Sequence, residues 1–245
     1  MNKRRALFGS ILCMLATILS ITACAEKKVL SPEESLKMDF PKMEARSIVP
    51  GPIEGLYEVR SDTDIIYYSP KSSSLFVGEI YAKTGENLTT KSRDLLIQAF
   101  IKELPLDKAI KIGSGKNTVI MWTDPDCPYC RQVEEYFKGK KDITRYVYLL
   151  PLEQLHPKAT VKAENILCQT DENKVRVFLE TMSGAFDKSD LKPCSDVKIK
   201  IALSDNKVLA QKMGINGTPF LVVNGSIVRG ADMKRIDMLL TAGAK

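Results

Sequence analysis

The stretch from Val119 to Cys130 constrains the fold most, because an apolar run leads there through a short acidic turn into two cysteines three positions apart. The residues that follow, Arg131–Lys138, are typical of a helix and place Cys127 at its first turn. Unpaired N–H groups and the positive end of the helix dipole favour a thiolate at that point. Pro128 suits an early helical position, where its missing N–H costs nothing. Cys130 lies one turn further on, close enough to attack a mixed disulfide formed by Cys127.

Cysteine usage narrows the chemistry further. Two of the six cysteines, Cys13 and Cys24, lie in the N-terminal apolar segment, and the others are Cys127, Cys130, Cys168 and Cys194. The four cysteines outside the N-terminal segment are an even number, as is typical of an exported chain whose cysteines form disulfides. A zinc site is the rival interpretation, but Cys168 and Cys194 are 26 residues apart and do not form a knuckle, so we predict no metal. If those two cysteines pair, closing the loop contributes about 3–4 kcal/mol.

Residues 1–24 have the pattern of an export signal. The positive Lys3–Arg5 precedes an apolar run, and Ile21-Thr22-Ala23-Cys24 resembles a bacterial lipobox, in which the cysteine is lipidated. Two alternatives stay open: cleavage at an A-x-A-like site would release a soluble protein, and an uncleaved segment would act as a short anchor. All three place the folded part outside the cytoplasm, where disulfides persist.

Composition and charge exclude some partners. The 245 residues are 44% hydrophobic and 27% charged, as in ordinary globular proteins. The formal net charge is +6, of which three positive charges lie in Lys3–Arg5, leaving 6 − 3 = +3 mixed with acidic residues. No basic stripe indicates nucleic acid binding. Gly115-Lys116 lacks the spacing of a phosphate loop.

The first half of the chain predicts a small N-terminal domain, residues 25–90, and a linker helix within 91–105. Ser31 to Glu34 fits a helix capping box. Three short β-rich runs follow and predict an antiparallel meander: Leu56–Arg60, Ile65–Ser69 and Leu75–Ala82. So small a unit buries little core alone and usually needs a partner surface. The linker helix, residues 91–104, shows an apolar face at Leu95, Leu96, Ala99, Phe100 and Leu104.

Residues 106–245 change to a β–α pattern. Strands are predicted at Ala109–Ile112, Thr118–Thr123, Thr144–Leu150, Phe220–Val223 and Ser226–Arg229, with Asn224-Gly225 as a hairpin turn. A helical insertion at about 152–213 holds three helices, Thr160–Leu167, Lys174–Met182 and Val197–Met213. A final amphipathic helix covers Met233–Leu240.

Other residues around the cysteines carry weaker predictions. Pro219, which opens a strand after Gly-Thr, indicates a tight turn with a possible cis bond, the alternative being an ordinary turn proline. We expect Tyr129 to be exposed and to contact substrates. Trp122 is interpreted as core packing rather than a substrate contact, and His156, the single histidine, as a loop residue.

Taken together, these residues resemble the bacterial periplasmic disulfide isomerases of the DsbC/DsbG family. The resemblance lies in the site Trp122-Thr123-Asp124-Pro125-Asp126-Cys127-Pro128-Tyr129-Cys130, in Gly217-Thr218-Pro219, and in the order of the domains. It implies an α/β thioredoxin-like fold with a helical insertion, preceded by a small α+β, cystatin-like dimerisation domain and a linker helix. It also implies a V-shaped homodimer, a structural Cys168–Cys194 disulfide, substrate binding at Thr218 and Pro219, and a membrane electron donor of the DsbD type.

The resemblance has one departure that bears on activity. Family isomerases more often carry Gly-Tyr between the cysteines, whereas this chain has Pro128-Tyr129. The dipeptide tunes redox poise, and Asp124 and Asp126 are expected to oppose the thiolate. We therefore predict a thiol–disulfide oxidoreductase without cofactor, acting on misfolded or misoxidised exported proteins in the periplasm, tethered through Cys24. Isomerase, reductase and disulfide-donating oxidase stay open, as does a chaperone-like holdase.

Overall fold

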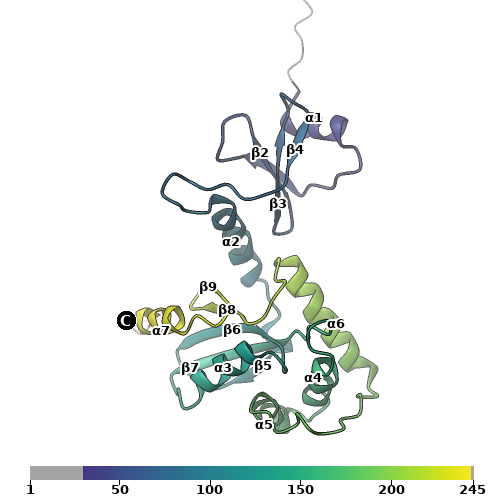
Figure 1. The fold of residues 1–245 in the computed structure, drawn as a ribbon, viewed down its shortest axis with the longest axis vertical. Coiled ribbons are helices and arrows are strands. Elements are labelled where there is room, and N and C mark those ends of the chain that lie inside the picture. Colours follow the sequence, from purple (N-terminus) through teal and green to yellow (C-terminus); the bar gives the residue numbers. More distant parts are fainter. Residues whose placement is uncertain (1–29, 244–245) are drawn as a thin grey trace, which may run out of the picture.

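The computed structural model describes residues 30–243, which form an N-terminal part and a larger C-terminal part joined by helix α2 (Figure 1). The predicted export signal and Cys24 lie outside the described residues. Among residues 30–243, no helix is long and apolar enough to cross a membrane.

The N-terminal part begins with α1, Pro32–Asp39, and the predicted capping box is present. The Ser31 N–H donates to the Glu34 carboxylate at 2.9 Å, and the Glu34 N–H donates to the Ser31 hydroxyl at 3.1 Å. The helix buries Leu36 against Val59 and Tyr68 of the neighbouring sheet. A small separate core therefore holds this part together.

The neighbouring sheet is an antiparallel meander in the order β1-β2-β3-β4, as predicted. Its strands are β1 (Ser47–Pro50), β2 (Tyr57–Ser61), β3 (Asp64–Ser69) and β4 (Ser74–Phe76), of which β1 was not predicted. The predicted extension of the last strand to Ala82 is wrong. The Ile80 N–H donates to the Thr89 hydroxyl at 2.9 Å, and the Ile80 carbonyl accepts from Leu88 N–H at 2.8 Å. Hydrogen bonding in this segment is therefore directed to the start of α2 and not to a strand.

Helix α2 spans Leu88–Ile101 and is capped by Asn87, whose side chain accepts from Thr90 N–H at 2.9 Å. The predicted apolar face is wrong at Leu95, which is 63% exposed, and at Ala99, which is also exposed. The buried apolar position is Ile97, which packs into the cluster around Trp122 in the C-terminal part. Its first turn is bonded to the N-terminal sheet, since the hydroxyls of Thr89 and Tyr67 lie 2.6 Å apart. The helix therefore packs against both parts, and the contact at Ile97 selects a buried face that periodicity alone did not.

The C-terminal part contains a five-stranded sheet in the order β5-β7-β6-β8-β9. After a 3-10 turn, η1 (Leu106–Lys108), its strands are β5 (Ile110–Ile112), β6 (Asn117–Thr123), β7 (Ile143–Leu149), β8 (Phe220–Val223) and β9 (Ser226–Arg229). The central strands β6 and β7 are parallel and their neighbours run antiparallel. The β8–β9 turn has positive φ at Asn224 (49°) and Gly225 (83°), which fits the predicted two-residue hairpin.

Helices cover both faces of this sheet (Figure 1). They are α3 (Pro128–Phe137), α4 (Ala159–Leu167), α5 (Asp171–Met182), α6 (Val197–Lys212) and α7 (Met233–Gly243). One core cluster joins the sheet to α3, α5 and α7 through Val133, Phe178 and Ile236. The other joins it to α2 and α6 through Ile97 and Ala210. The expected α/β thioredoxin-like fold with a helical insertion is confirmed.

The two parts also touch directly, near the end of α6. The Thr63 hydroxyl, in the β2–β3 turn, donates to the Lys212 carbonyl at 3.1 Å. Gly214 follows with φ +62°, and a Cβ there would lie 2.8 Å from the Thr63 hydroxyl oxygen. The absence of a side chain at Gly214 is therefore what allows this close approach.

Candidate active site

The two central cysteines lie at the start of α3, directly after β6. Cys127 is the N-cap of α3 and Pro128 is its first residue, so the helix starts where the sequence predicts. Both thiols are free, and Cys127 is 5% and Cys130 0% exposed. The central strand β6 leads to the first cysteine at its carboxyl end, and one helical turn brings the second cysteine beside it.

The surroundings make the Cys127 sulfur the more acidic of the two. Hydrogen bonding with the Cys130 thiol, helped by the Thr218 side chain and by the N–H groups of Cys130 and Tyr129, lowers the pKa of Cys127 to about 5 against the opposing effect of burial. Burial, followed by the hydrogen bond with Cys127, raises the pKa of Cys130 far above its ordinary value. At neutral pH the site therefore holds one thiolate and one protonated thiol.

The loop before β8 forms the opposite side of the site. The Thr218–Pro219 bond is cis, and the Cys127 thiol lies 3.5 Å from the Thr218 carbonyl, to which it donates when protonated. The Pro219 carbonyl accepts from Gly230 N–H at 2.9 Å, which ties the loop to the end of β9. Residues 91 positions apart in sequence thus meet at the first sulfur.

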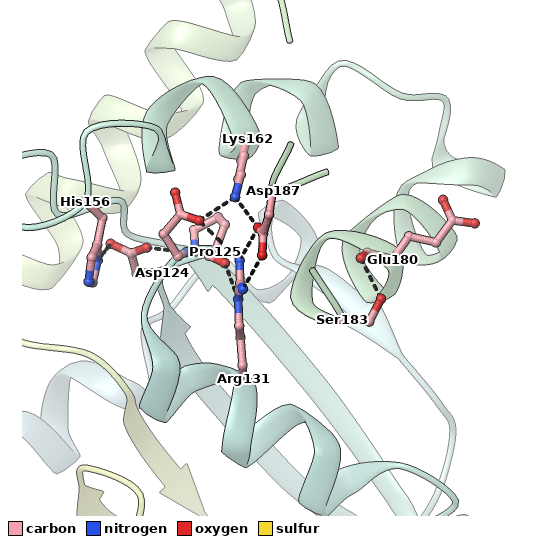
Figure 2. Close-up of polar contacts among 9 residues, drawn as sticks. Asp124, Pro125, Arg131, His156, Lys162, Glu180, Ser183 and Asp187 are labelled. Atoms are coloured by element: carbon pink, nitrogen blue, oxygen red, sulfur yellow. Dashed lines mark hydrogen bonds and ion pairs between the residues drawn. The ribbon is translucent and has the colours of Figure 1, made fainter. Parts of the chain in front are cut away.

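Asp124 is buried beside the Cys130 sulfur and contacts a following loop. Its backbone N–H lies 3.4 Å from the Cys130 sulfur. Its carboxylate accepts from the N–H groups of Asp126 and Leu152, each at 2.7 Å, and lies 3.0 Å from Nδ1 of His156 (Figure 2). His156 is a loop residue, as predicted, but sequence reasoning missed its contact with Asp124. The interval of 32 residues carried no signal for that contact.

Asp126 lies in a cluster of alternating charges. Its carboxylate accepts from the Lys162 ammonium and, at 3.2 Å, from Nη2 of Arg131. Asp187 binds the same two cations, at 2.5 Å from Lys162 and at 2.7 and 2.8 Å from Arg131 (Figure 2). The expectation that Asp126 opposes the thiolate stays a prediction, and the two cations bound to its carboxylate reduce that opposition.

Comparison with known proteins identifies the family of this chain. The profile of the "Disulfide bond isomerase protein N-terminal domain" matches residues 22–90, and the "Thioredoxin-like domain" matches residues 104–234. The chain belongs to the DsbC-type thioredoxin-like family.

Relatives of this family match at different lengths. A "Probable thiol:disulfide interchange protein DsbC" of Bordetella avium is 32% identical over 170 residues, covering 68% of this chain but only 58% of that protein. The "Thiol:disulfide interchange protein DsbC" of Salmonella typhimurium is 27% identical over 239 residues, covering 94% of this chain and 91% of its own. The crystal structure of alpha-DsbA2 from Wolbachia pipientis aligns with a TM-score of 0.50 at 16% identity over 62% of this chain and 97% of its own, a likeness of fold.

The second cysteine pair lies in the insertion of this family member. Cys168, the C-cap of α4, is bonded to Cys194, which precedes α6, across a Cα–Cα distance of 6.3 Å. The Cys194 N–H donates to the Glu164 carboxylate at 3.0 Å. The bond therefore ties the first inserted helix to the segment that leads into the last one.

Two aromatic residues lie near the cysteine pair in the sequence, one between the cysteines and one before them. Tyr129 is 60% exposed and lies beside Cys127 at the surface. Trp122 is fully buried and stacks on Tyr148 with ring centroids 4.9 Å apart, so it packs in the core as predicted. In the described part of the chain, no group of three or more His, Cys, Asp or Glu side chains could hold a metal ion.

Proposed function

We propose that this protein is a thiol–disulfide oxidoreductase of exported proteins, acting as an isomerase and reductase through Cys127 and Cys130. The observation that carries the proposal is the asymmetry of the pair: Cys127 has a lowered pKa beside the Thr218 carbonyl, whereas Cys130 is buried and protonated. An attacking thiol whose pKa lies below ambient pH is mostly thiolate, and its partner is held in reserve.

The reaction follows from this arrangement. The Cys127 thiolate attacks one sulfur of a client disulfide, forms a mixed disulfide, and releases the other client sulfur as a thiolate. If a client thiolate attacks the mixed disulfide, the client is rearranged and the Cys127 thiolate is regenerated. If Cys130 loses its proton and attacks the Cys127 sulfur, the client leaves reduced and the protein is left with a Cys127–Cys130 disulfide. We assign Thr218 and Pro219 to the client backbone and Tyr129 to client side chains.

Single-cysteine variants test this proposal. Cys127→Ser should abolish both rearrangement of scrambled ribonuclease and reduction of insulin. Cys130→Ser should abolish reduction and retain much of the rearrangement, because only reduction needs the second attack. A Cys127→Ser protein that still rearranged disulfides would refute the proposed nucleophile. If that variant suppresses aggregation of an unfolded client and does nothing else, the holding function exists separately.

The direction of electron flow is a second part of the proposal. An isomerase or reductase must be kept reduced, which implies a membrane donor of the DsbD type. Trapping free thiols in cells with an alkylating mass tag should show Cys127 and Cys130 reduced while Cys168 and Cys194 are oxidised. All four oxidised would favour a disulfide-donating oxidase.

Location and organisation complete the proposal. We infer export to the periplasm and lipid attachment at Cys24, which metabolic labelling with a fatty acid should detect and Cys24→Ser should remove. We divide the mature chain into a dimerisation domain at 25–90, a linker helix at 91–105 and a catalytic domain at 106–245. The separate core of Leu36, Val59 and Tyr68 supports the first of these boundaries.

A further inference from the structure

Lys162 is a buried charged residue that the exchange reaction described above does not use. It lies on the inserted helix α4, and only 3% of its side chain is exposed. A buried ammonium is costly unless it is paired and hydrogen-bonded. Its nitrogen donates to Oδ1 of Asp126 and, at 2.5 Å, to Oδ1 of Asp187. The residue therefore connects the insertion to the loop that precedes the first catalytic cysteine.

Arg131 supports the same loop from α3. Its Nε donates to the Pro125 carbonyl at 3.0 Å, and Nη2 lies 3.2 Å from the Asp126 carboxylate. Figure 2 shows Lys162 and Arg131 approaching Asp187 from opposite sides. The cluster of two cations and two carboxylates thus fixes Pro125 and Asp126, the two residues directly before Cys127.

The surroundings are shaped for this cluster. Gly184 has φ +90°, and a Cβ there would lie 3.0 Å from the Asp187 carboxylate and 3.7 Å from an Arg131 nitrogen. A glycine at this position leaves room for the ion pair. The Arg131 guanidinium and then the Lys162 ammonium hold the pKa of Asp187 well below its usual range, so Asp187 is ionised at any physiological pH.

We propose that Lys162 is a positioning residue for the nucleophile: it fixes Asp126 and compensates its charge next to Cys127. This inference rests on the proposed function of Cys127. Without Lys162, a carboxylate directly before the nucleophile would lose its nearest buried cation. A negative charge so close disfavours the thiolate. The helical insertion would therefore contribute to reactivity and not only to packing.

Four variants test the proposal by the pH dependence of Cys127 alkylation with iodoacetamide. Lys162→Met should raise the pKa of Cys127 by roughly one unit, which slows alkylation about fivefold at pH 5 and leaves the rate at pH 9 unchanged. Lys162→Met with Asp126→Asn should restore the original profile, because the uncompensated charge is gone. Asp126→Asn alone should lower the pKa, since both cations remain. Lys174→Met is the control, because it removes an ion pair of α5 with Asp171 outside this cluster.

The outcomes separate this inference from the proposed function. An unchanged profile in Lys162→Met would refute the role of Lys162 while exchange activity stands. A double variant that keeps the raised pKa would also refute it, because disturbed structure and not charge would be the cause. If Lys162→Met does not fold, Asp126→Asn alone decides: an unshifted profile refutes the proposal. An unreactive Cys127 in the unaltered protein would instead overturn the proposed function.

Discussion

At the scale of single residues, the site depends on a contrast between two sulfurs one helical turn apart. Cys127 is at the N-cap of α3, where N–H groups favour the thiolate, whereas Cys130 is sealed in the core. Burial and hydrogen bonding therefore give two otherwise identical thiols different acidities, which the proposed roles of nucleophile and resolving cysteine require.

This contrast predicts the pH dependence of reactivity. Because the pKa of Cys127 is lowered to about 5, its thiolate is present above that pH and is lost as the pH falls through it. Alkylation of the reduced protein, followed by mass spectrometry, should show one fast-reacting cysteine with a half-maximal rate near pH 5. Equal labelling of Cys130, or a midpoint near pH 9, would contradict the contrast.

A second residue-scale prediction concerns Asp124. Its carboxylate accepts two backbone N–H groups, those of Asp126 and Leu152, which Asp124→Ala would leave buried without an acceptor. The free energy of unfolding in urea should fall by about 2–4 kcal/mol. Asp124→Asn keeps one acceptor oxygen and should lose less. Asp171→Ala, at a side chain 98% exposed, is the control and should change little.

Residue-level prediction from the sequence succeeded for local patterns and failed for distant contacts. Cys127 at the start of a helix and the buried Trp122 follow from neighbours in the chain. The contacts of His156 with Asp124 and of Lys162 with Asp126 join positions 32 and 36 apart. They depend on how the insertion folds back over the site, which no local pattern encodes.

At the scale of elements, the helical insertion is the part of the fold that a disulfide crosslinks. Its helices α4, α5 and α6 were predicted within a few residues of their observed bounds. Short or doubly packed elements were harder, such as β1 with four residues and the true buried face of α2. There, tertiary contacts outweigh the local pattern.

The disulfide predicts a measurable loss of stability. It closes a separation of 26 residues, so replacing Cys168 and Cys194 together by Ser should lower the free energy of unfolding by about 3–4 kcal/mol. Hydrogen exchange should report earlier opening of α4 and α5 than of the central strands. Unchanged stability in urea would mean that packing alone holds the insertion.

At the scale of the whole molecule, the N-terminal sheet presents an open edge. Strand β4 is one of its two edge strands, and apolar side chains at its end and in the segment after it are exposed, Phe76 by 55%, Val77 by 85% and Tyr81 by 63%. Such an edge is a template for pairing with another chain. It supports the proposed homodimer through residues 25–90.

Light scattering tests the dimer directly. Residues 25–245 should have twice the chain mass at micromolar concentration. Val77→Asp should shift the protein towards monomer while alkylation of Cys127 stays as fast, because the edge lies on the N-terminal part and the cysteine on the other. A monomer in the unaltered protein would refute the proposed assembly.

In the proposed dimer, the contact of Thr63 with the backbone at Gly214 would fix the angle between the two parts of each chain. Thr63 contacts the backbone at this point, so a side chain at position 214 would collide with it and tilt the N-terminal part about the end of α2. In a dimer the same tilt would occur in both chains, so the distance between the two copies of Cys127 would change by the sum of both tilts. The five-stranded sheet of each chain would stay intact. The absence of a single methyl group at position 214 would therefore determine how large a client fits between the two active sites of the proposed dimer.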